Sequence, residues 1–371
     1  MTADRAASGI RAPLDVATAP PTRMAWVDRL RVVLTFLVVA HHCAITYSTI
    51  PLWYWAETGD DSSASLLTVF VVVNQLWFMG AFFLLSGVFA PGSLDRKGPA
   101  RFAADRLIRL GIPLVLFVLL LRPLALLPGA IAGDAEARGV DVLTYVLVGG
   151  DPGPAWFLEV LLVFSLGAAL IRRVIGKRES RVAVAKASPL WGLLAFAAVL
   201  VAATVLWQRV VPDGSYWPVV GLPTPAYLMQ YLAMFLVGIV AARRGWLQSV
   251  PRWWIWPAAA LMAGGAVCSA LGPAATPIAN PLFATGAIVT AVIVFRRFAD
   301  GPLSRGWSFL AENAFAVYVL HAPVVVAVSA LLVPLALPAW GKATLLFAIA
   351  APVTWLLAAA LRAIPGVRRV F

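Results

Sequence analysis

The chain has 371 residues, of which 61% are hydrophobic and only 12% are charged, and its mean hydropathy is +0.88. This composition excludes a water-soluble globular protein, because so apolar a surface would not stay in solution. The formal net charge of +12 does not indicate a nucleic-acid-binding protein, since the basic residues lie in short segments between long apolar runs.

About ten apolar runs follow one another along the chain, each close to the roughly 20 residues that a helix needs to cross a bilayer. The predicted spans are residues 25–48, 66–90, 104–127, 154–175, 189–209, 225–243, 253–271, 280–297, 312–334 and 341–361. The predicted fold is therefore all-α, a polytopic membrane protein of about ten transmembrane helices in one domain, residues 23–363. We expect residues 1–22 to form a disordered cytoplasmic tail and residues 364–371 a short basic one.

The basic residues predict the orientation of these spans, because Lys and Arg concentrate in cytoplasmic loops. With both termini in the cytoplasm, all but four of the 29 Lys and Arg fall in cytoplasmic segments. The four exceptions are Arg122, Arg138, Arg209 and Lys342. The sequence therefore predicts a multi-pass protein of the cell (plasma or inner) membrane, with both the N- and C-termini cytoplasmic.

All three histidines lie inside predicted spans, where an ionisable side chain is costly unless it faces a partner or water. His42 follows Arg31 by eleven residues, so the two share one stripe of the first span and lie about 16 Å apart along its axis. His41 points about 100° away from that stripe. His321, with Tyr318 one turn before it, lies at a similar depth in the ninth span. We expect the two histidine levels to border a common cavity.

Other charged residues occupy the ends of two spans. Arg106 and Arg109 lie one turn apart where the third span leaves the cytoplasm. They are either positive-inside anchors or, together with Arg31, three guanidiniums that bind an anionic phosphate. Glu159, near the outer end of the fourth span, could orient a histidine or receive a proton, but it could equally form a structural ion pair with Arg122.

The second span contains a polar position and a small-residue contact. Asn74 lies at mid-depth and is a candidate substrate ligand, and Ser86-Gly87 predicts a close approach of two helices. Cys43 and Cys268 each lie inside an apolar run and support neither a disulfide nor a zinc site, so we predict no metal.

Six elements occur in a fixed order along the chain. They are the Arg31-x10-His42 spacing, the run Phe82-Phe83-Leu84-Leu85-Ser86-Gly87, Arg106-Leu-Ile-Arg109 with Pro113, Trp156-Phe157-Leu158, Phe235-Leu236-Val237-Gly238, and Tyr318-Val-Leu-His321-Ala-Pro323. Together they resemble the acyltransferase-3 family of multi-span membrane acyltransferases, and within it the glucan biosynthesis protein C-like branch. The resemblance covers about residues 24–362.

This resemblance implies transfer of a short acyl group, acetyl or succinyl, from cytoplasmic acyl-CoA to a hydroxyl of a glycan, lipid or secondary metabolite. It makes His42 the catalytic residue and places Arg31, Arg106 and Arg109 near the acyl-CoA. The partners implied are the lipid bilayer, acyl-CoA as donor co-substrate and the hydroxyl acceptor.

Imidazole titrates near pH ~6.5, which suits a general base for a hydroxyl nucleophile. We therefore expect His42 to take the acceptor's proton, or else to carry the acyl group transiently. His321 and Tyr318 are expected to orient the acceptor or stabilise the oxyanion, and Trp156 to contact substrate.

Two other functions remain open on the residues alone. A transporter or flippase would use the buried histidines and Glu159 as a proton relay. A non-catalytic assembly or sensor protein would tolerate replacement of all three histidines.

Overall fold

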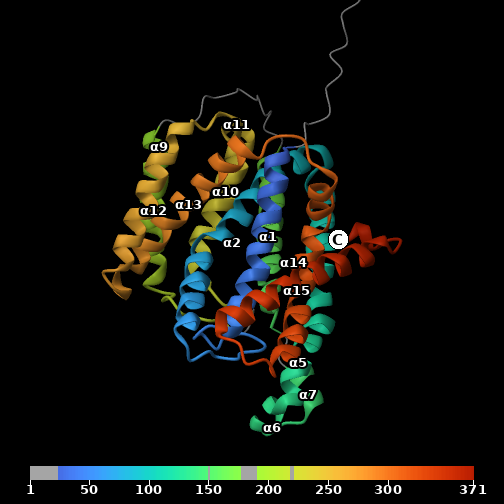
Figure 1. The fold of residues 1–371 in the computed structure, drawn as a ribbon. Coiled ribbons are helices and arrows are strands. Elements are labelled where there is room, and N and C mark those ends of the chain that lie inside the picture. The colour runs from blue at the N-terminus through green and yellow to red at the C-terminus, as the bar shows by residue number, and fades with distance from the viewer. Residues whose placement is uncertain (1–23, 149–150, 177–189, 218–220) are drawn as a thin grey trace, which may run out of the picture.

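The computed structural model describes residues 24–148, 151–176, 190–217 and 221–371 (Figure 1). Helices dominate these ranges, and the only extended pairing within them is an isolated bridge between Trp217 and Leu222. The all-α prediction is confirmed. The predicted N-terminal tail, residues 1–22, lies outside the described residues.

Within the described ranges, nine helical segments are long and apolar enough to cross a membrane. They are Ala25–Tyr47 (α1), Ser62–Lys97 (α2), Pro99–Ala137 (α3 to α6), Gly153–Ile175 (with α8, Trp156–Ile175), Leu190–Gln208 (α9), Pro225–Arg244 (with α10, Leu228–Arg244), Pro273–Phe298 (with α13, Thr276–Phe298), Arg305–Leu332 (α14) and Ala339–Ala363 (α15). They correspond to nine of the ten predicted spans.

The remaining predicted span, residues 253–271, is a shorter helix than expected. It contains α12, Ile255–Ser269, whose 15 residues fall below the roughly 20 that a crossing needs. Pro251 precedes the turn that leads into it, and Gly272, at a φ of +99°, ends the segment before Pro273. These breakers shorten the helix, which packs against α13 (Figure 1).

The third segment is longer than the predicted 104–127 and irregular. Five-residue π-helical turns at Leu107–Gly111, Phe117–Leu121 and Ala130–Asp134 separate its α-helical parts α3 (Pro99–Arg106), α4 (Ile112–Leu116), α5 (Arg122–Gly129) and α6 (Ala135–Ala137). Pro113 and Pro123 each follow such a turn, because a proline has no N–H to continue the α-helical ladder. With α7 (Val142–Leu147), α5 and α6 form a projection at one end of the bundle (Figure 1).

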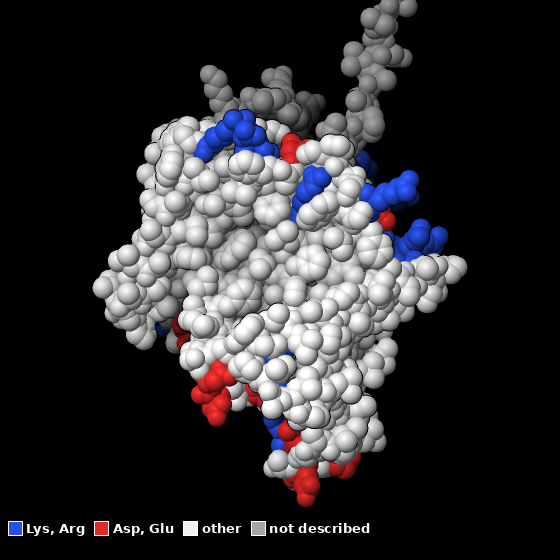
Figure 2. Space-filling view, viewed as in Figure 1, with Lys and Arg blue, Asp and Glu red and all other residues white. Residues whose placement is uncertain are grey.

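The two ends of the bundle carry opposite charge. Helices α2, α8, α10, α13 and α15 all have Lys or Arg in their last turn. The loop carboxylates Glu57 and Asp61, and Asp141 before α7, lie at the opposite end. Figure 2 shows this separation of Lys and Arg from Asp and Glu along the molecule. We call these the basic end, where α1 begins, and the acidic end.

Helices α2 and α10 approach so closely that only glycine fits at their crossing. A Cβ added to Gly87 would lie 2.1 Å from the carbonyl oxygen of Phe235, and one added to Gly238 would lie 2.2 Å from that of Leu84. Both obstacles are backbone atoms, so a side chain here forces the helices apart. The close contact predicted at Ser86-Gly87 is therefore present.

We expect Gly87→Ala to destabilise the protein by about 1–3 kcal/mol, as overpacking of a tight contact does. Gly167→Ala in α8 is the matched control, because a Cβ there meets nothing within 4 Å. Thermal unfolding of both purified variants in detergent checks this. Equal melting temperatures for Gly87→Ala and the unmodified protein would contradict it.

Candidate active site

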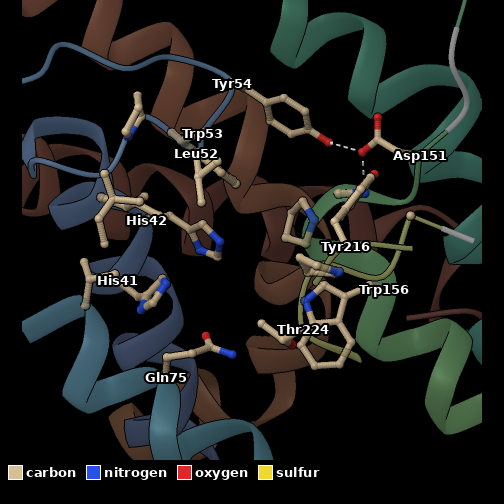
Figure 3. Close-up of a pocket in the computed structure, with 18 of the residues that line it drawn as sticks. His41, His42, Leu52, Trp53, Tyr54, Gln75, Asp151, Trp156, Tyr216 and Thr224 are labelled. Atoms are coloured by element: carbon tan, nitrogen blue, oxygen red, sulfur yellow. Dashed lines mark hydrogen bonds between the residues drawn. The ribbon is translucent and has the colours of Figure 1, made fainter. Parts of the chain in front are cut away.

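A cavity of about 620 Å³ lies toward the acidic end of the bundle and is bordered by two of the three histidines. His41 and His42 contribute from α1, Gln75 from α2, Trp156 from the start of α8, and Tyr54 from a loop. Figure 3 shows Trp156 across the space from His41 and His42. We call this space the histidine cavity. Its walls therefore come from residues more than 100 positions apart in the chain.

The structure brings His42 and His321 into direct contact. Nε2 of His321 lies 3.1 Å from Nδ1 of His42. Nδ1 of His42 is also 2.8 Å from the carbonyl oxygen of Val38, and Nδ1 of His321 is 2.7 Å from that of Tyr318. A carbonyl oxygen only accepts, so these partners assign the proton to Nδ1 in both neutral rings. Nε2 of His321 then accepts a hydrogen bond from the Nδ1–H of His42. Nε2 of His42 carries no proton and keeps its lone pair.

This arrangement lets Nε2 of His42 accept a proton and lets His321 stabilise the ring that results. When Nε2 of His42 takes a proton, the ring becomes a cation, and the lone pair of His321 stabilises it through the existing hydrogen bond. His321 itself is fully buried and lines neither this cavity nor the arginine-lined one described below. The ring of Trp53 covers His42, with 4.2 Å between ring centroids. The contact of Trp53 with His42 depends on how the loop between α1 and α2 folds, so no local pattern in the sequence indicates it.

One residue of this region differs from its predicted place. Asn74, the candidate substrate ligand, is buried and does not line the cavity; its Nδ2 lies 3.3 Å from the carbonyl oxygen of Leu37 and 3.5 Å from Nδ1 of His41. The next residue, Gln75, faces the cavity instead, because successive helical side chains point about 100° apart. His41 does line the cavity, although it leaves the Arg31–His42 stripe, since the cavity extends around the end of α1 toward α2.

An ion pair fixes the far wall of the histidine cavity. Asp151 lies 2.8 Å from Nε of Arg122, accepts from the backbone N–H of Gly153 at 2.9 Å, and is 3.5 Å from the hydroxyl of Tyr54 (Figure 3). Burial raises the pKa of Tyr54 well above its ordinary value, and the Asp151 carboxylate raises it further, so the hydroxyl stays protonated. Neither Asp151 nor Tyr54 was predicted as a site residue; the available signal was an acidic residue, Asp151, five positions before the Trp156-Phe157-Leu158 element.

Glu159 does not take part in this wall. The alternative that it pairs with Arg122 is wrong, because Asp151 occupies that place. Glu159 lies in the first turn of α8 and lines neither of the two cavities. The proton relay of the transporter hypothesis therefore gains no support from its position.

A second cavity, of about 450 Å³, lies at the basic end and gathers guanidinium groups. It is lined by five arginines: Arg31, Arg106, Arg109, Arg362 and Arg368. The first three are the arginines that the sequence predicts either as positive-inside anchors or as a phosphate site, and the last two belong to the predicted cytoplasmic basic residues. We call this space the arginine cavity.

The last two arginines of this set are placed by the end of the chain. Nη1 of Arg362 donates to Oδ1 of Asn313 at 2.9 Å, which fixes its guanidinium against α14. The turn after Gly366 brings Arg368 back, and its Nε donates to the carbonyl oxygen of Arg362 at 3.1 Å. Residues 364–371, predicted as a separate tail, therefore fold back onto the bundle and form part of the cavity wall.

Helix α1 contributes to both cavities. Arg31, near its start, lines the arginine cavity, and His42, near its end, lines the histidine cavity. The side chains of Phe82, Phe157 and Tyr318 close the arginine cavity on the side of the histidine pair. The arrangement can hold an anion at one end and activate a hydroxyl at the other.

Comparison with known proteins bears on this arrangement. None of the curated proteins matches the sequence of this chain. A family model described as an acyltransferase domain, that of the acyltransferase-3 family, matches residues 24–359, from the start of α1 into α15. The closer resemblance to the glucan biosynthesis protein C-like branch stays a prediction. The match covers all of the residues that line the histidine cavity, and all that line the arginine cavity except those after residue 359, such as Arg362 and Arg368. The chain belongs to the acyltransferase-3 family of membrane acyltransferases.

Proposed function

We propose that this protein transfers a short acyl group, acetyl or succinyl, from acyl-CoA to a hydroxyl of a glycan, lipid or secondary metabolite. The observation that carries this proposal is the pair of cavities on one helix, with arginines at the basic end and the base His42 toward the acidic end. The basic end would face the cytoplasm of a plasma or inner membrane, because Lys and Arg concentrate on that side.

The arginine cavity suits the anionic part of acyl-CoA. Guanidinium groups bind phosphate oxygens by paired, charge-assisted hydrogen bonds. Arg31 and His42 are about 16 Å apart along α1, so the extended thioester arm of a donor anchored at Arg31 would point toward the histidine pair. The hydroxyl acceptor would enter the histidine cavity from the acidic end.

The proposed reaction begins with proton removal. Nε2 of His42 takes the proton of the acceptor hydroxyl while the hydroxyl oxygen forms a bond to the thioester carbonyl carbon. The tetrahedral intermediate then collapses, the carbon–sulfur bond breaks, and the CoA thiolate takes the proton from His42. Ester and free CoA thiol leave, and the base is regenerated. The hydroxyl of Tyr318 already donates to the carbonyl oxygen of Pro154, so we assign Tyr318 to the wall rather than to the oxyanion.

We expect His42→Ala to lower acyl transfer by a factor on the order of 100 or more, because the hydroxyl loses its base. Radiolabelled acetyl-CoA or succinyl-CoA is supplied to vesicles of the membrane that holds the protein, and base-labile label in the products is counted. Cys43→Ala, at the next position of α1, is the control and should keep the activity. Undiminished transfer by His42→Ala would refute the assignment.

In this proposal His321 acts on His42 through a hydrogen bond. The activity of a His321 variant should therefore depend on whether the new side chain can accept a hydrogen bond. We expect His321→Phe to lower transfer by about 10-fold or more, because the protonated His42 loses its acceptor. His321→Gln, whose amide oxygen can still accept, should recover part of the loss. The same vesicle assay measures both. Equal losses for the two variants would indicate that His321 serves packing alone.

The arginine cavity should determine donor affinity. We expect Arg106→Gln and Arg362→Gln each to raise the KM for acyl-CoA by about 10-fold or more, with a smaller change in kcat, since each removes a charge-assisted hydrogen bond. Arg101→Gln is the matched control, because Arg101 belongs to the same helix, α3, but is exposed and lines neither cavity. If Arg101→Gln raised the KM as much, the loss of positive charge at the basic end would explain the effect, and the arginine cavity would not be the donor site.

A further inference from the structure

Three aromatic rings close the inner end of the arginine cavity. Phe82 of α2, Phe157 of α8 and Tyr318 of α14 all line it. Their ring centroids lie 5.7 Å apart for Phe82 and Phe157, 5.6 Å for Phe157 and Tyr318, and 6.4 Å for Phe82 and Tyr318. Rings at these separations pack against one another, so the three form a triangle of mutually contacting rings.

The histidine cavity lies on the other side of this aromatic triangle. The hydroxyl of Tyr318 donates to the carbonyl oxygen of Pro154, and Pro154 lines the histidine cavity. The backbone carbonyl of Tyr318 accepts from Nδ1 of His321, and the Tyr318 and His321 ring centroids are 6.0 Å apart. Trp156, next to Phe157, also lines the histidine cavity. The triangle is therefore the partition between the two cavities.

We propose that the aromatic triangle is a filter for the acyl group, which must pass between these rings to reach His42. This inference rests on the proposed function, in which the donor is held at the arginines. A two-carbon acetyl group needs only a small displacement of the rings to pass. A longer acyl chain needs a larger displacement with each added methylene.

The chemistry of the triangle also selects against charge. Phe82 and Phe157 offer no hydrogen bond, and the hydroxyl of Tyr318 is already engaged with Pro154. A charged acyl group such as succinyl would lose its hydration here without a replacement, which is costly. The filter therefore selects a short, uncharged acyl group, and we assign acetyl as the natural substrate.

Selectivity among acyl donors tests the filter. Vesicles that contain the full-length protein and the native acceptor receive acetyl-, butyryl-, hexanoyl- or succinyl-CoA, and release of free CoA thiol gives kcat/KM for each. The unmodified protein should prefer acetyl-CoA to each of the others by about 10-fold or more, since a single methylene is discriminated by such factors in a tight site. Phe157→Leu and Phe82→Leu, each of which shortens one ring, should raise the butyryl-to-acetyl ratio by about 10-fold.

Two control variants distinguish an effect on the filter from a general loosening of the helix packing. Phe164→Leu makes the same change seven residues further along α8, where the ring packs on Phe83 and Phe235 and lines neither cavity. It should leave the ratio unchanged. Tyr318→Phe keeps the ring and loses the hydroxyl, so it should also keep the length preference.

The outcomes distinguish the two proposals. No release of CoA from any donor by the unmodified protein would refute the proposed function and the filter with it. Acetyl transfer combined with an unshifted ratio in both Phe157→Leu and Phe82→Leu, or with an equal shift in Phe164→Leu, would refute the filter alone. A preference of the unmodified protein for succinyl-CoA would also overturn the assignment of acetyl.

Discussion

The hydrogen bond between His321 and His42 joins two helices that are far apart in the sequence, and the chemistry of the site depends on it. In the interior of a bundle that lies in a membrane, polar groups must find partners within the protein. The carbonyl oxygens of Val38 and Tyr318 meet this need at Nδ1 of each ring, and thereby leave Nε2 of His42 with its lone pair, the nitrogen that we propose as the base. The same requirement that stabilises the fold thus selects the tautomer.

Helix α1 is the element that turns this pair into a site. Because 3.6 residues make a turn, side chains eleven positions apart face the same way, and Arg31 and His42 reach two cavities from one rigid rod. Helices α2, α8 and α14 then complete the partition with one aromatic ring each. The distance between the arginine cavity and the proposed base is consequently fixed by helix geometry rather than by loops, which suits the proposed reaction because that reaction needs a defined approach.

The sequence predicted what local periodicity determines and missed what depends on distant contacts. Apolar runs and helical phase gave the long spans and the Arg31–His42 stripe, because both depend on residues within one helix. The span that contains helix α12 was predicted too long, because the residues that end it, such as Gly272, interrupt an otherwise apolar run. Arg362 and Arg368 carried no local signal for the arginine cavity; a turn of the chain after α15 brings them there. Gln75 faces the histidine cavity in place of the predicted Asn74, because the rotation of α2 about its axis is set by its packing against other helices.

Two cavities that approach each other from opposite ends of a membrane protein create a risk of leakage. An open, water-filled passage between them would let protons and ions cross the bilayer, whereas closely packed apolar rings exclude water and raise the barrier to charge. The triangle of Phe82, Phe157 and Tyr318, which we propose as the partition between the cavities, would meet this need. A partition that excludes water would also protect a thioester from hydrolysis until a hydroxyl reaches His42. Selectivity for the acyl group and impermeability to protons and ions would then both result from the packing of these three rings.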